Sequence, residues 1–113
     1  MANPNIVNVT SILGETTYLT PSSTSSVILL PNAASSGKVY KINQIVAANV
    51  DGSSAVNTSV DIYTDGSVAQ GSAASGGTAY PIVSTVSVPA DASLIVVDKT
   101  TAIYLMENTS IAV

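Results

Sequence analysis

Short segments rich in Val, Ile and Thr run through almost the whole sequence and are separated by turn residues. Good surface-helix formers such as Glu, Lys, Arg and Gln are scarce, and no segment has the spacing of an amphipathic helix. We count about eight or nine strand-like segments with turn signals roughly every 8–12 residues, the spacing of a sandwich or barrel. The sequence therefore predicts an all-β fold.

The predicted strands are recognised by β-branched residues and by alternation of apolar and polar side chains. They cover residues 5–11 and 15–20, which are expected to pair, and residues 27–30, 38–50, 56–63, 79–88, 93–97, 101–106 and 110–113. The strictest alternation lies in residues 56–63, and it predicts a core face made of Val56, Val60 and Ile62. In the longest segment the alternation weakens, so we expect a bulge or bend near Gln44.

Turn residues and prolines indicate where the strands end and which lie at an edge. Asp51-Gly52 predicts a hairpin, Pro31 is expected to end a strand, and Pro81 fits only an edge strand. The last predicted strand stops after few residues, which suggests truncation after Val113. If the chain ends there, Ile111 and Val113 are expected in a neighbour's sheet or at a short edge.

The length of 113 residues predicts one domain spanning residues 1–113. Without Phe or Trp, the core must be filled by Val, Ile, Leu and Ala, which favours two thin, closely packed sheets. We therefore predict a single antiparallel β-sandwich of jelly-roll or Greek-key type. A small aliphatic core is marginal by itself, so a homo-oligomer is expected.

The charge content excludes one large class of partner. Only 9% of the residues are charged, and the net charge is −4. Binding to nucleic acid requires a cationic patch, and three lysines do not make one. The remaining surface must be rich in small and hydroxylated residues, which lose little entropy at an interface and carry no charge to desolvate.

Catalytic and metal-binding groups are also scarce. The chain has no His, Cys or Arg, so we expect no enzyme and no cofactor. Asp61 and Asp65 faintly resemble a calcium loop, but the distal ligands are missing, so no metal site is predicted. No apolar run reaches the roughly 20 residues of a membrane span, and there is no secretory signal. A soluble protein made in a cytoplasm is expected.

Residues 65–78 form a long run of small residues without periodicity. Loops of this length are usually functional or disordered, so the run is either a binding arm that becomes ordered against a neighbour or a tolerated insertion. We expect the interface to combine this run with the apolar N-terminal segments and one later tyrosine. The candidate residues are Ile6, Val7, Val9, Tyr18, Leu19, Asp65, Gly66, Gly71, Gly76, Gly77 and Tyr80.

Three stretches carry a resemblance to a known group of proteins. They are residues 1–12, the sequence Lys38-Val39-Tyr40-Lys41-Ile42-Asn43, and residues 86–106, in which Val88-Pro89-Ala90-Asp91-Ala92-Ser93-Leu94, Asp98-Lys99 and Ile103-Tyr104-Leu105 are most specific. On the basis of these stretches, the whole chain resembles small virion structural proteins of tailed bacteriophages, especially those that infect cyanobacteria. Those proteins generally continue with an acidic Gly-Asp type turn and a further strand, whereas this chain has Glu107-Asn108-Thr109.

The resemblance implies a non-enzymatic virion component made in the host cytoplasm. The first hypothesis is a capsid decoration, or cement, protein that binds the major capsid protein on the outside of the head and stabilises it. A neck or tail ring component, in contact with other virion proteins, is the alternative. A module that binds host-surface glycans is a further alternative from a different class, although the aromatic platforms of sugar sites are sparse here.

Overall fold

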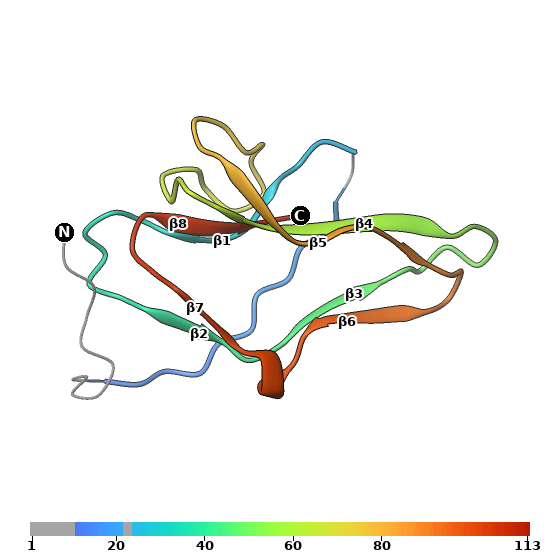
Figure 1. Cartoon of the computed structure of the whole chain (residues 1–113), viewed down its shortest axis with the longest axis horizontal. Coiled ribbons are helices and arrows are strands. Elements are labelled where there is room, and N and C mark those ends of the chain that lie inside the picture. Colours follow the sequence, from blue (N-terminus) through green and yellow to red (C-terminus); the bar gives the residue numbers. More distant parts are fainter. Residues whose placement is uncertain (1–10, 22–23) are drawn as a thin grey trace.

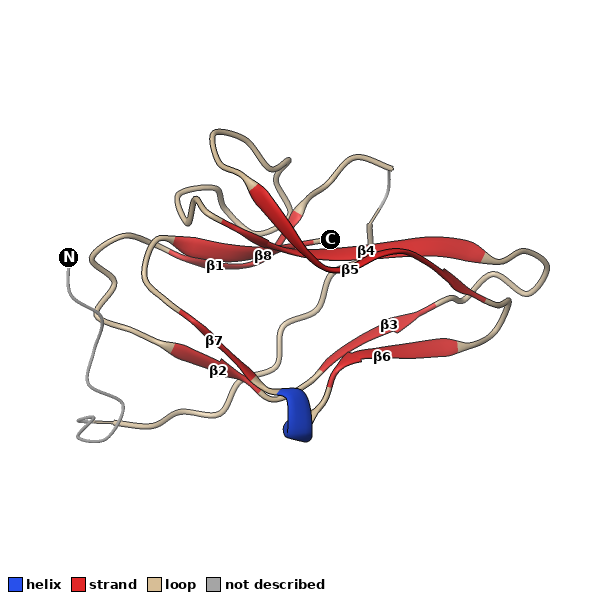
Figure 2. Cartoon of the chain, in the orientation of Figure 1, coloured by secondary structure: helices blue, strands red, loops and turns tan. Residues whose placement is uncertain are grey.

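The computed structural model describes residues 11–21 and 24–113. Within these residues the chain is all-β, as predicted, and its single short helix is of the 3-10 type (Figures 1 and 2). The elements are β1 (Ile28–Asn32), β2 (Tyr40–Ile42), β3 (Ile45–Ala48), β4 (Val56–Tyr63), β5 (Ala79–Val88), β6 (Ser93–Val97), η1 (Lys99–Thr101), β7 (Ile103–Leu105) and β8 (Thr109–Ala112).

The strands form two layers. The upper layer in Figure 1 is a four-stranded sheet in the order β1-β8-β4-β5, and the lower layer consists of the pairs β2-β7 and β3-β6. All pairings are antiparallel. Four of them are nested, with β1 on β8, β2 on β7, β3 on β6 and β4 on β5, and β4 also pairs with β8 within the sheet. Such nesting is the strand pairing of a jelly roll, so the predicted sandwich class is confirmed.

The lower layer is one two-stranded ribbon with a bend in its middle. The predicted strand over residues 38–50 is interrupted between Ile42 and Ile45, which confirms the expected bend near Gln44. On the other strand η1 makes the corresponding bend, and Figure 2 shows it at the lowest point of the V-shaped ribbon. Asp98 fixes this turn, since its Oδ1 atom accepts hydrogen bonds from the backbone nitrogens of Thr100 and Thr101, at 2.9 and 3.1 Å.

The core lies between the two layers and is aliphatic. Its buried members are Ile42, Ile45, Val60, Val97, Leu105 and Ile111. A second, smaller cluster, made of Ile28, Tyr63 and Ala112, lies between the sheet and residues 65–78. The predicted core face of β4 is correct for Val60, and Ile62 is half-buried, but Val56 is 42% exposed because β4 extends beyond the ribbon at that end (Figure 1).

Three expectations about strand ends are wrong. β1 continues through Pro31 to Asn32, because an edge strand needs no amide donor on its free side. The Asp51-Gly52 turn joins β3 to β4, which lie in different sheets, so it is not a hairpin. β8 is an interior strand between β1 and β4 and buries Ile111, so neither a neighbour's sheet nor a short edge is required.

The expected first strand pair is not formed. Residues 15–20 have no strand structure, and residues 5–10 lie outside the described part of the chain. Among described residues, the only backbone group of residues 11–21 in a hydrogen bond is the Tyr18 carbonyl, which accepts from Gln70 Nε2 at 2.9 Å. Apolar and polar residues alternate in residues 15–20, but no described strand pairs with this segment.

β5 is an edge strand, as its proline predicts, and its pairing with β4 is irregular. The register shifts between Thr58 and Val60, and Thr85 has a φ of 49°. The Thr85 amide donates to Ser59 Oγ at 2.8 Å instead of to a carbonyl of β4. A bulge with a β-branched residue in the left-handed region bends the edge.

Two buried asparagines hold the loops to the layers. Asn32 Nδ2 donates to the Lys38 carbonyl at 2.9 Å and to the Leu105 carbonyl at 3.1 Å, which connects β1 to the ribbon. Asn49 Nδ2 donates to the carbonyls of Ser54 and Val88 at 2.8 and 3.1 Å. Each side chain donates to backbone carbonyl groups that the strand pairing leaves without a donor.

Candidate functional site

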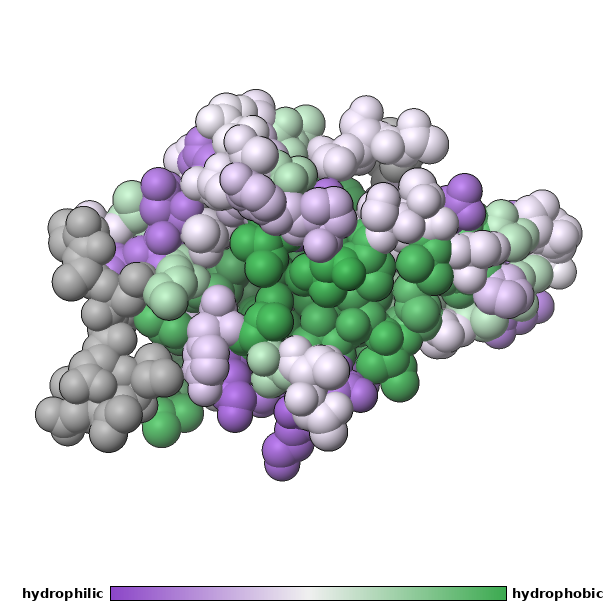
Figure 3. Space-filling model, in the orientation of Figure 1, coloured by the Kyte–Doolittle hydropathy of each residue, from purple (hydrophilic) through white to green (hydrophobic). Residues whose placement is uncertain are grey.

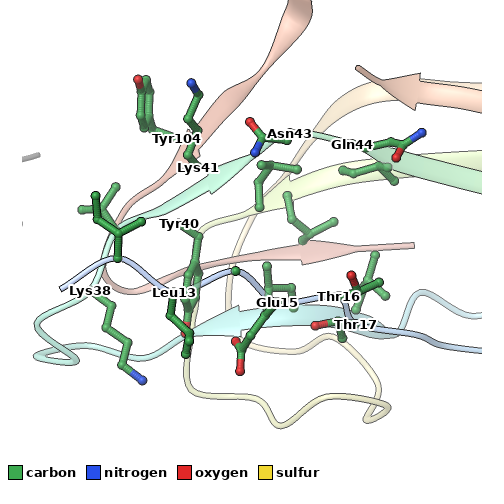
Figure 4. A pocket seen from close by; sticks show the side chains of 18 of the residues that line it. Leu13, Glu15, Thr16, Thr17, Lys38, Tyr40, Lys41, Asn43, Gln44 and Tyr104 are labelled. Atoms are coloured by element: carbon green, nitrogen blue, oxygen red, sulfur yellow. The ribbon is translucent and has the colours of Figure 1, made fainter. Parts of the chain in front are cut away.

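A groove opens between the two layers on the side of β2 and β3. One wall is the extended segment of residues 11–17, the other is residues 37–45, and the floor is formed by Leu29, Leu30 and Ile111 (Figure 4). Its volume is about 1010 Å³. We call this feature the interlayer groove. Its floor belongs to the sheet that carries the core, so the apolar interior is accessible from this side.

The rim of the interlayer groove carries opposite charges. Lys38 lies on the ribbon side and Glu15 on the extended segment, and both lie at the opening, whereas the side chain of Lys41 points with that of Tyr104 to the outer face of the ribbon (Figure 4). No ion pair joins Lys38 to Glu15 within the described residues. The rim thus has one of the three lysines of an acidic chain and one carboxylate.

Large apolar side chains border the groove without being buried. Ile12 is 90% exposed and Leu13 is 80% exposed, although both line the groove. Exposed apolar side chains gathered at one opening are typical of a surface that is covered by another protein.

The opposite side of the sandwich also leaves apolar surface uncovered. Figure 3 shows a continuous apolar area in the middle of this face, between the sheet and the ribbon. In Figure 1 this area lies between β5 above and the ribbon of β2-β7 and β3-β6 below. The two layers therefore do not close on either side.

Residues 65–78 are ordered against their own chain, which corrects the expectation that they need a neighbour. The Ile28 amide donates to the Ser72 carbonyl at 3.0 Å, and the Gly71 amide donates to the Ile28 carbonyl at 2.8 Å. Val68 and Ala74 pack on the second cluster, so the segment does bury apolar side chains. An irregular run can be ordered in this way because β1 offers it a free edge.

The predicted interface residues fall into separate groups. Asp65, Gly66, Gly76 and Gly77 lie together where residues 65–78 leave and rejoin the sheet, and Gly71 lies on β1. Gly66 is buried within the chain. An added β-carbon at Gly77 would lie 2.9 Å from the ring of Tyr63, so this glycine is needed for packing.

The remaining predicted residues are distributed over the surface. Tyr18 is 81% exposed, Tyr80 on β5 is 59% exposed, and Leu19 is half-buried. Ile6, Val7 and Val9 lie outside the described residues. Sequence reasoning missed the groove rim, and Lys38, one of only three lysines in the chain, was the one signal that could have pointed to it.

Three described aspartates accept hydrogen bonds from nearby Ser or Thr residues. Hydrogen bonds from Ser53 lower the pKa of Asp51, those from Ser67 lower the pKa of Asp65, and those from Thr100 lower the pKa of Asp98. Burial raises the pKa of Asp61 on β4. Among residues 11–21 and 24–113 no three His, Cys, Asp or Glu side chains are grouped as metal ligands.

Comparison with models of protein families, with curated proteins and with solved structures finds no match. Within the described chain, no helix has the length and apolar character needed to cross a bilayer.

Proposed function

We propose that this chain is a non-enzymatic structural protein of a bacteriophage virion, and that it acts as a capsid decoration protein. In this role many copies bind the major capsid protein on the outer face of the head. Each copy bridges neighbouring capsid subunits and stabilises the shell by mass action, by RT ln(1 + [L]/Kd) per site.

The observation that carries the proposal is the open sandwich. The interlayer groove and the apolar face of Figure 3 leave interior surface exposed, and residues such as Leu13 and Ile95 are largely exposed, at 80% and 58%. A monomer rarely leaves such areas uncovered, whereas a subunit of an assembly covers them on binding. The same contacts with other subunits also stabilise the small aliphatic core.

Charge supports the outer face of a shell. The described acids lie on several elements, among them Asp51, Asp61, Asp98 and Glu107, and the chain has a net charge of −4. Packaged nucleic acid repels such a protein. The proposed partners are therefore other virion proteins.

Particles that contain the chain provide the test. Mass spectrometry should find hundreds of copies per particle, and particles without the chain should release their genome at a lower temperature. The purified chain, added back, should restore the rupture temperature. An unchanged rupture temperature contradicts the decoration role, and a count of about six or twelve copies indicates a ring in the neck or tail.

A further inference from the structure

We propose that the interlayer groove is a contact surface for a second copy of this chain, in which residues 11–17 of each copy enter the groove of the other. The contact is symmetric, because the entering segment and the groove belong to the same surface. It goes beyond the role in a particle, since two copies can join whether or not they are bound to a shell.

The apolar part of the contact is supplied by both halves of the surface. Ile12 and Leu13 border the groove but are 90% and 80% exposed, so in one copy they contact little of it. The backbone of residues 11–17 forms one wall of the groove in its own copy, and the open volume of the groove lies next to this wall. In a two-fold arrangement the segment of the second copy faces this space, and its apolar side chains reach the floor of Leu29 and Ile111.

Charge complementarity identifies the occupant as the same chain. Lys38 is the cation of the rim, and the carboxylate of Glu15 is two residues from Leu13 on the segment that enters. In the symmetric contact, each Glu15 meets Lys38 of the other copy. Since the chain is otherwise acidic, a general acidic partner is repelled by the remaining surface, whereas this segment brings one carboxylate to one lysine.

In the described part of the chain, unpaired backbone amides and carbonyls are present both on residues 11–17 and on the free edges of β2 and β3. Residues 11–17 form no backbone hydrogen bond with another described residue, and β2 and β3 each pair with one strand only. An extended segment with free amides and carbonyls can add to a free strand edge. Contacts of this kind give affinity, while the apolar and charged side chains determine the register.

Sedimentation of the purified full chain over a range of concentrations tests the contact. We expect a reversible dimer whose dissociation constant rises at least about tenfold in the variant Leu13→Asp. Val50→Asp is the matched control, since Val50 is equally solvent-exposed, at 89%, but lies in the turn between β3 and β4. A monomer at all concentrations, or equal weakening by both variants, overturns the proposal.

Charge reversal gives a sharper test. The variants Glu15→Lys and Lys38→Glu should each be monomeric, because like charges then meet across the contact. An equimolar mixture should form a heterodimer, since opposite charges meet at both halves. Dimers of either variant alone, or no heterodimer in the mixture although thermal unfolding shows both to be folded, overturn the proposal.

Cysteine cross-linking shows whether residues 11–17 lie in the groove of the other copy or only beside the groove of their own. The chain has no cysteine of its own that would interfere. The single variants Leu13→Cys and Lys38→Cys are mixed and oxidised. A covalent dimer that contains one of each variant supports the contact, and Val50→Cys in place of Leu13→Cys should give none. Failure of the Leu13 pair to cross-link, or equal yields from both pairs, contradicts it.

Discussion

Gly66 lies directly against the backbone carbonyl of Asn32. A β-carbon at position 66 would overlap that carbonyl, and it would also lie 3.1 Å from the Cα atom of Asn108. The neighbours are backbone atoms, so no side chain can turn away to make room. This contact holds residues 65–78 close to the end of β1.

The variant Gly66→Ala should therefore lower the free energy of unfolding by at least about 1–3 kcal/mol, the cost of overpacking in a well-packed interior. Urea unfolding measures the change. Gly14→Ala is the control, because an added β-carbon there has no atom within 4 Å, and a change within about 0.5 kcal/mol is expected. Equal stability of the two variants would show that the loop does not pack on β1 in solution.

Asn32 offers a second test of the joint between the layers. The variant Asn32→Ala removes the donors to the carbonyls of Lys38 and Leu105, and each buried carbonyl left unsatisfied costs about 1–3 kcal/mol. Asn32→Asp keeps the shape but donates to neither carbonyl, so it should be no more stable than Asn32→Ala. Thermal unfolding of both should be compared with that of Asn57→Ala, where the side chain is exposed and no loss is expected.

Asp61 predicts a dependence of stability on pH. Burial raises its pKa above the ordinary value of 3.8, so the folded chain binds a proton more tightly than the unfolded chain. The contribution of Asp61 to stability is therefore fully present below pH 3.8 and is lost as pH rises through the raised pKa. The variant Asp61→Asn should melt at a higher temperature than the natural chain at pH 7, and this gain should shrink towards pH 3. A gain that grows on acidification would contradict the assignment.

Thr85 predicts a stabilising substitution. A β-branched residue at a φ of 49° is strained, and left-handed backbone costs an ordinary residue roughly 1–2 kcal/mol, whereas Asn tolerates it better. The variant Thr85→Asn should raise the free energy of unfolding by up to about 1 kcal/mol in urea titrations. Ser84→Asn, on the neighbouring residue, should bring no gain. A loss of stability in Thr85→Asn would mean that the threonine side chain has a role in the bulge.

Sequence patterns predicted individual strands better than their partners. β4, β5 and β6 have the predicted bounds, because alternation and turn residues are local properties that each segment shows by itself. Pairing is not local. Asp51-Gly52 has the residues of a hairpin, yet the chain crosses there from the ribbon to the sheet.

The candidate site was hidden for the same reason. Glu15 and Lys38 are 23 positions apart in the sequence, and only the passage of residues 11–17 beside the ribbon brings them to one rim. Conversely, residues 65–78 have a composition without obvious order, and the free edge that orders them belongs to a strand about 40 residues earlier. Composition describes a segment but not the surface that receives it.

The nested pairing has a consequence for biosynthesis. Among the described strands β8 comes last in sequence order, but it occupies the position between β1 and β4. During translation from the N-terminus, β1 therefore waits for a partner more than 75 residues away, while only β4 and β5 can pair early. The ribosome must release all residues through β8 before the sheet can close, and contacts so distant in sequence make folding slow. A nascent chain that stalls before Thr109 exposes the edges of β1 and β4 together, and it should depend on chaperones to avoid aggregation.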